Sequence, residues 1–167
     1  KVEGPGPQCG MVFQNHRLLP WLKIKENVGF GLEGMSKSEK EAKVMQHIEL
    51  VGLAGFEHSY PSQLSGGMAQ RAAIARAMIN EPGIIFADEP TGALNKRNTG
   101  EVLDLLTELN KEGQSILMVT HDLRAAVRGT RLLYLEDGKI LDELSMPVFH
   151  PEDERTREAA INDWLAS

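Results

Sequence analysis

Short apolar runs and amphipathic segments alternate along this chain of 167 residues, and their spacing predicts its secondary structure. Short apolar runs bounded by Gly, Pro or Asp are typical of buried strands in parallel sheets. Apolar residues three or four positions apart predict helices that bury one face. The expected strands are 11–13, 84–87, 115–120, 131–135 and 139–144, and the expected helices are 25–32, 36–51, 68–79, the segment around 102–109, 123–127 and 152–165.

Polar residues and glycines mark where several of these elements begin and end. Ser36 and Glu39 form a capping box that predicts a helix start, and Gly52 predicts the end of the same helix. Asp137-Gly138 between the last two expected strands is typical of a β-hairpin turn. The alternation of strands and helices predicts an α/β domain with a parallel sheet.

Composition and charge narrow the class of protein. The chain is 41% hydrophobic and 25% charged, which is typical of a globular domain with a core. Its net charge of −6 argues against a dedicated nucleic-acid binder. The single cysteine, Cys9, excludes an internal disulfide and fits a reducing compartment. With no membrane-spanning apolar stretch and nothing resembling a signal peptide, we expect a cytoplasmic protein.

The tripeptide Ser65-Gly66-Gly67 directly precedes the helix expected over 68–79. Such a helix start presents backbone N–H groups at the positive end of the helix dipole, where a phosphate group binds well. A Gly-rich turn that simply caps a helix has the same sequence. The tripeptide alone leaves both interpretations open.

Two carboxylates and a histidine follow two of the expected strands. Asp88 and Glu89 come directly after 84–87, at the strand end where open α/β sheets bind ligands. There Asp88 is suited to hold Mg²⁺ and Glu89 to polarise a water molecule, although a polar turn would have the same sequence. His121 follows the next strand, where it would either reach the same cleft or be an ordinary solvated histidine.

Taken together, four segments in this order resemble the ATP-binding-cassette (ABC) ATPases, the nucleotide-hydrolysing subunits of ABC transporters. The segments are Phe13-Gln14, Leu64 to Gly67, Ile84 to Pro90 and Thr120 to Asp122. The resemblance covers nearly all of residues 8–145. It implies a P-loop NTPase fold, with a helical subdomain at about 25–80, the remainder of the parallel-sheet core at about 81–145, and a C-terminal helical extension at 146–167.

The resemblance also implies a role for each candidate residue. Glu89 would be the catalytic base, Asp88 and Gln14 would serve Mg²⁺, and His121 would contact the γ-phosphate of ATP. In this family two subunits pair head to tail, so that the signature motif of one covers the ATP bound to the other. Asn95 stands where many members have the D-loop aspartate, which removes a charge. The residues implied to contact the partner's ATP are Ser65, Gly66, Gly67 and Met68.

One motif of the family is missing from these residues. The P-loop pattern G-x-x-x-x-G-K-[ST], which holds phosphates, does not occur. The resemblance places it, with an aromatic residue that stacks on adenine, upstream of Gln14, where only thirteen residues stand. We therefore expect an N-terminally truncated cassette without its N-terminal strands, which exposes apolar sheet edges. Because Asp88 and Glu89 alone repel a triphosphate, we expect this chain by itself to bind ATP weakly and to be inactive.

The resemblance points to two groups of transporters. Residues 4–79 are similar to ATPases that import nitrate, sulfonate and taurine, and residues 84–144 to exporters of antimicrobial peptides or lipoproteins. This mixture indicates either a chimeric or recombined gene or a separate lineage of the family. The apolar loop 18–22 around Trp21 would either anchor the helical subdomain or dock on membrane permease subunits. The implied function is ATP hydrolysis that energises transport of a small solute at the inner face of the cell membrane. The alternative is a non-enzymatic fragment that lends its signature motif to a partner's ATP site, and cassettes of DNA repair or translation are disfavoured by the acidic balance.

Overall fold

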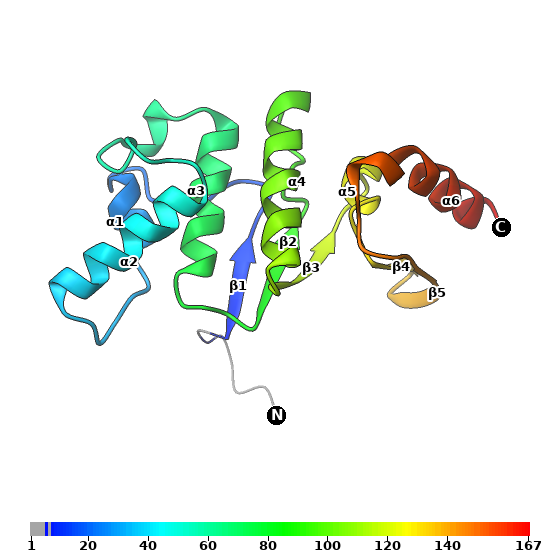
Figure 1. Cartoon of the computed structure of the whole chain (residues 1–167), viewed down its shortest axis with the longest axis horizontal. Helices are drawn as coiled ribbons and strands as arrows, with labels where there is room; N and C mark the ends of the chain where they lie inside the picture. Colours follow the sequence, from blue (N-terminus) through cyan, green and yellow to red (C-terminus); the bar gives the residue numbers. More distant parts are fainter. Residues whose placement is uncertain (1–5, 7) are drawn as a thin grey trace. The chain divides into compact units, whose positions relative to one another are not determined.

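The computed structural model describes residue 6 and residues 8–167, and the chain divides into two compact units (Figure 1). Unit 1 ends at Val119 and unit 2 begins at Thr120. The elements of unit 1 are β1 (Cys9–Val12), α1 (Ile24–Val28), α2 (Lys37–Leu50), a 3-10 turn (Pro61–Gln63), α3 (Gly66–Met78), β2 (Ile84–Asp88), α4 (Lys96–Lys111) and β3 (Ser115–Val119). Those of unit 2 are α5 (Leu123–Ala126), β4 (Arg131–Glu136), β5 (Lys139–Ser145), a 3-10 turn (Pro151–Asp153) and α6 (Glu154–Ala166).

Unit 1 is built on a three-stranded parallel sheet in the order β1-β2-β3, which confirms the predicted parallel sheet. Helices α3 and α4 pack on one face of this sheet (Figure 1). The packing of α3 on β1 is so close that a Cβ atom on Gly10 would lie 2.6 Å from the Ala77 carbonyl oxygen. The buried cluster between sheet and helices consists of Val12, Ile74, Ile85, Ala87, Val102, Leu106 and Leu109.

The other face of the sheet is largely exposed. Met11 is 43% exposed, Leu117 is 48% exposed and Val119 is 62% exposed. The prediction that 115–120 is a buried strand is therefore wrong for this chain, because α3 and α4 cover only one face and every second residue of β3 points away from them. Met11 belongs to β1, and Leu117 and Val119 belong to β3, so these exposed apolar side chains are on the edge strands of the sheet, which agrees with the expected exposure of apolar sheet edges.

Helix α2 begins and ends where the sequence predicts. The Ser36 hydroxyl accepts the Glu39 N–H at 3.3 Å, and the Glu39 carboxylate accepts the Ser36 N–H at 3.0 Å, which is the expected capping box. Gly52, with φ of +73°, lies just beyond the helix end in the left-handed conformation that favours glycine. Helices α1, α2 and α3 share a second buried cluster that includes Leu18, Ile48 and Ala72.

Unit 2 contains the predicted hairpin. Strands β4 and β5 pair antiparallel, and the turn residues Asp137 and Gly138 have φ values of +48° and +74°, as a two-residue hairpin turn requires. Helix α6 begins two residues later than predicted because Pro151–Asp153 forms a separate 3-10 turn. In the part of the chain that the structure describes, no helix is both long and apolar enough to cross a membrane.

Candidate functional site

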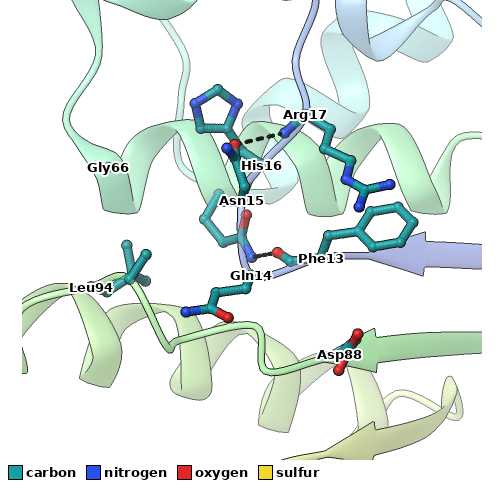
Figure 2. A pocket seen from close by; sticks show the side chains of 10 residues that line it. Phe13, Gln14, Asn15, His16, Arg17, Gly66, Asp88 and Leu94 are labelled. Carbon is teal, nitrogen blue, oxygen red and sulfur yellow. Dashed lines mark hydrogen bonds between the residues drawn. The ribbon is translucent and has the colours of Figure 1, made fainter.

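A cavity of about 570 Å³ lies where β1 and β2 end and α3 begins (Figure 2). Parallel strands present their carboxyl ends at one edge of a sheet, which is where α/β proteins place ligands. The cavity brings together Gln14, Gly66 and Asp88, which belong to three separate motifs of the sequence. The full lining is Phe13, Gln14, Asn15, His16, Arg17, Gly66, Gln70, Asp88, Ala93 and Leu94.

Gln14 follows β1 closely, and its side chain extends toward the loop that carries Leu94 (Figure 2). A Cβ atom on Gly92 would lie 2.8 Å from the Gln14 Nε2 atom. The absence of a side chain at Gly92 therefore leaves the space that the Gln14 carboxamide occupies. The Gln14 side chain, which follows β1, therefore packs closely against the loop at Gly92, which follows β2.

Asp88 is the exposed last residue of β2, and Glu89 is the first residue of the following turn. The Glu89 backbone has φ of +45°, an uncommon conformation for a residue with a side chain. The turn is held by the Glu89 N–H, which donates to the Val119 carbonyl oxygen of β3 at 2.8 Å. An uncommon backbone conformation that the surrounding structure stabilises is frequent at functional sites. Asp88 lines the cavity, whereas Glu89 lies beside it in sequence and is not part of its lining.

The donor set fits Mg²⁺ only when phosphate supplies further ligands. Among the described residues, no group of three or more His, Cys, Asp or Glu side chains gathers as a metal site would require. Asp88 and Gln14 each bring one oxygen-bearing side chain to the same cavity. Mg²⁺ commonly takes one or two carboxylates and completes its octahedron with phosphate oxygens and water. The residues present therefore suit a magnesium–phosphate complex rather than a metal held by protein alone.

Helix α3 begins at Gly66, two residues earlier than the predicted Met68. The Ser65 hydroxyl oxygen accepts the Met68 N–H at 3.2 Å, so the helix-capping interpretation is confirmed for this serine. Gly66 is exposed and lines the cavity, whereas Gly67 is buried, and a Cβ atom there would lie 2.7 Å from the Asn98 side chain. The binding of a partner's ATP at this helix start stays a prediction.

Asn95 has a clear structural role as the N-cap of α4. Its Oδ1 atom accepts the Asn98 N–H at 2.9 Å. An aspartate would cap the helix equally well, so the cap explains why either residue is compatible with the fold here. The consequence of the missing charge for a dimer interface stays a prediction.

His121 belongs to unit 2, where it is exposed directly before α5. Asp122 is the N-cap of α5 and accepts the Arg124 N–H at 2.9 Å. Hydrogen bonds from the Arg124 side chain are the main cause that lowers the pKa of Asp122. The predicted contact of His121 with a γ-phosphate stays a prediction.

Several residues that shape the cavity were not singled out from the sequence. The Arg17 guanidinium lies over the Phe13 ring, 3.8 Å from its centroid. Arg76 donates to the carbonyl oxygens of Arg17 at 2.8 Å and His16 at 2.9 Å, and burial, followed by the charge of Arg76, lowers the pKa of His16. Gln70 had a detectable signal, because it stands at helical spacing from the apolar residues Ala73, Ile74 and Ala77.

The comparisons with known proteins agree with this geometry. A family model described as "ABC transporter" matches residues 2–92, more than half of the chain. Over 157 residues the chain is 41% identical to the methionine import ATP-binding protein MetN of Streptococcus agalactiae, and the match covers 90% of this chain and 44% of that protein. Over 151 residues it is 42% identical to the taurine import ATP-binding protein TauB of Yersinia pestis, with coverage of 87% and 59%.

Solved structures give the same result. The chain superimposes with a TM-score of 0.72 and 39% identity on the dimeric ATP-binding cassette MJ0796 in a post-hydrolysis state bound to ADP and Pi, covering 85% of this chain and 64% of that one. The fold is therefore the P-loop NTPase fold of ATP-binding cassettes. The chain belongs to the ABC transporter family, and it spans about half the length of the curated relatives it matches.

Proposed function

We propose that this chain forms part of the ATP-binding subunit of an ABC transporter, which hydrolyses ATP to energise transport of a small solute through partner membrane subunits. The observation that carries the proposal is the shared cavity of Gln14, Gly66 and Asp88. These residues come from parts of the sequence far apart, yet they line one space at the carboxyl ends of parallel strands.

The proposed roles follow from the chemistry of each side chain. Asp88 and Gln14 would hold Mg²⁺, which when bound draws charge from the phosphate groups. The Glu89 carboxylate would accept hydrogen bonds from the attacking water and polarise it. His121 would stabilise the charge that develops on the transferring phosphoryl group.

We also propose a head-to-tail dimer with a second ABC ATPase subunit. The relative MJ0796 is described as dimeric in a state bound to ADP and Pi. In this chain Gly66 is exposed at the start of α3, where backbone N–H groups and the helix dipole favour an anion. Ser65, Gly66, Gly67 and Met68 would thus approach the ATP of the partner.

The relatives favour import over export. Both MetN and TauB are named as import ATP-binding proteins, and each match runs through most of this chain. We therefore propose an importer of a small organic solute, with the chain held at the inner face of the membrane by permease subunits. This proposal extends the importer resemblance of residues 4–79 to the whole chain.

ATP hydrolysis is tested with a hybrid protein. Residues 8–167 are joined behind an N-terminal segment of another ABC ATPase that carries a P-loop and the adenine-stacking aromatic residue; we call this protein the P-loop hybrid. The hybrid is expected to hydrolyse ATP with Mg²⁺. The 167-residue chain alone is expected to bind ATP–Mg²⁺ weakly and to be inactive, because too few of its groups neutralise the triphosphate. Calorimetric titration and phosphate release measure the two properties.

The control hybrid has the P-loop lysine replaced by alanine. A folded hybrid without activity above this control would contradict the proposed ATPase function. Micromolar ATP affinity of the 167-residue chain alone would contradict the expected need for a P-loop.

A second candidate function is the contribution of the signature motif alone. The exposed start of α3 supports it, because Gly66 is accessible to a second subunit. It is tested by adding the chain to an ABC ATPase whose own signature serine has been replaced. Recovery of phosphate release by the unmodified chain, but not by its Ser65→Arg variant, would support this candidate.

The loop 18–22 divides its apolar side chains between core and surface. Leu18 is 5% exposed in the cluster of α1, α2 and α3, whereas Trp21 is 69% exposed. Buried Asn27 holds the loop, because its Oδ1 atom accepts the Leu19 N–H at 2.7 Å and its Nδ2 atom donates to the carbonyl oxygens of Leu19 and Leu22, both at 3.1 Å. The exposure of Trp21 supports the proposal that it docks on a permease subunit.

Trp21→Glu is expected to abolish co-purification with the membrane subunits and to change the free energy of unfolding by less than about 0.5 kcal/mol, since the residue is on the surface. Pull-down with the permease and denaturant unfolding measure the two effects. Leu18→Glu is the matched control, and it should destabilise the chain because it buries a charge. Normal permease binding by Trp21→Glu would argue against docking at this residue.

A further inference from the structure

Gln70 is a buried polar side chain that connects two segments of the candidate site. It lies in α3 and is 2% exposed. Its Nε2 atom donates to the Phe13 carbonyl oxygen at 2.6 Å, one of the hydrogen bonds drawn in Figure 2, and to the Pro90 carbonyl oxygen at 2.8 Å. One carboxamide thus bridges two backbone segments that are far apart in the sequence.

The two acceptors stand next to the proposed reactive residues. Phe13 directly precedes Gln14, and Pro90 directly follows the pair Asp88-Glu89. A carboxamide with both N–H groups engaged fixes the separation of the two carbonyl oxygens and, through the peptide units, the relative placement of the neighbouring residues. Because the bridge starts from α3, the helix that begins at Gly66 is also held in register with both segments.

The orientation of the carboxamide is determined by its partners. Both neighbours are carbonyl oxygens, which only accept hydrogen bonds, so the amide nitrogen must face them. Among the described residues the buried Oε1 atom of Gln70 has no hydrogen-bond partner. The carboxamide therefore uses its donors for the bridge and leaves its acceptor unpaired. A residue of the same length without donors would fill the space and lose the connection.

We infer that Gln70 is a positioning residue that sets the distance between Gln14 and the Asp88-Glu89 pair. It does not touch the reacting atoms itself. This inference rests on the proposed ATPase function for its kinetic consequence, whereas the bridge itself is testable in the chain alone. Displacements of about 1 Å in an active site can lower a rate by about 10²-fold, so loss of the bridge matters for turnover.

The bridge is tested first in the 167-residue chain by nuclear magnetic resonance. Gln70→Met keeps the length of the side chain and removes both donors, and it should shift the carbonyl ¹³C resonances of Phe13 and Pro90. Arg71→Met is the matched control, because the neighbouring Arg71 donates to two other carbonyl oxygens, those of Val51 at 3.0 Å and Gly52 at 3.5 Å. The control should shift only the latter pair, and unchanged Phe13 and Pro90 resonances in a folded Gln70→Met chain would overturn the inference.

The kinetic consequence is tested in the P-loop hybrid. Gln70→Met is expected to lower kcat by about 10- to 100-fold with little change in KM for ATP, whereas Arg71→Met should retain most of kcat after correction for the folded fraction. Gln70→Asn, which keeps the donors on a shorter side chain, should recover part of kcat and serves if the methionine variant does not fold. Equal kcat values for the Gln70 and Arg71 variants would overturn the inference. An inactive unmodified hybrid would contradict the proposed function instead, and the carbonyl shifts would still decide on the bridge.

Discussion

Glu89→Gln in the P-loop hybrid is expected to lower kcat for ATP hydrolysis by about 10²- to 10⁴-fold, the usual contribution of a general base. The amide keeps the size of the side chain but cannot accept a proton from the attacking water. ATP affinity should change little, since the proposed role of Glu89 concerns water rather than phosphate. Phosphate release and equilibrium nucleotide binding measure the two quantities separately.

The backbone at Glu89 makes this test specific to the side chain. The conformation at φ of +45° is held by the bond from the Glu89 N–H to the Val119 carbonyl oxygen, and glutamine has the same backbone freedom as glutamate. The substitution should therefore leave the turn after β2 in place.

Glu108→Gln is the matched control for Glu89→Gln. Glu108 lies exposed on α4 and pairs with Lys111 at 3.1 Å, an ion pair of small energetic weight. It should retain nearly all activity. A Glu89→Gln hybrid that hydrolyses ATP as fast as this control would exclude Glu89 as the base.

Local patterns in the sequence predicted the helices and strands of the fold, although β1 is Cys9–Val12 rather than the expected 11–13 and α1 ends at Val28 rather than at residue 32. The apolar run that became β2, with Pro82-Gly83 before it and Asp88-Glu89-Pro90 after it, leaves little choice but a buried parallel strand. The burial of β3 was mispredicted. An apolar run shows that a strand can be covered on both faces of the sheet, but it does not show that other elements cover both faces. Coverage depends on which helices cross the sheet, and in the described part of unit 1 these lie on one face.

The candidate site was predictable only where a residue carries its chemistry in a local motif. Gly66 and Asp88 were singled out from their neighbouring residues and Gln14 only through the resemblance to ABC ATPases, and the structure brings the three to one cavity. Gln70 was missed because its partners are the backbone carbonyl oxygens of Phe13 and Pro90. Every residue type has such a carbonyl group, so the sequence at these positions does not indicate the hydrogen bonds. Periodicity showed at most that a polar side chain would be buried.

Gly66→Asp is expected to abolish most ATP hydrolysis by the P-loop hybrid without loss of stability. Gly66 is the first residue of α3, where an acidic side chain stabilises a helix by about 0.3–1 kcal/mol through its dipole. A Cβ atom at Gly66 would lie 3.4 Å from the Leu94 Cδ2 atom, an ordinary contact. The fold therefore tolerates the substitution.

The proposed composite site does not tolerate this charge. A carboxylate about 5 Å from a partner's phosphate charge costs roughly 3 kcal/mol at an effective dielectric constant of about 20, or about 10²-fold in rate or affinity. Gly66→Asn adds nearly the same volume without the charge and is the matched control, so its activity should exceed that of Gly66→Asp by about this factor. High salt should reduce the difference in activity between Gly66→Asp and Gly66→Asn only in part, because dissolved ions screen charges in a closed dimer interface poorly. Equal activity of the two variants, with thermal unfolding showing both folded, would mean that no phosphate approaches the start of α3, and the helix start would then be a cap and nothing more.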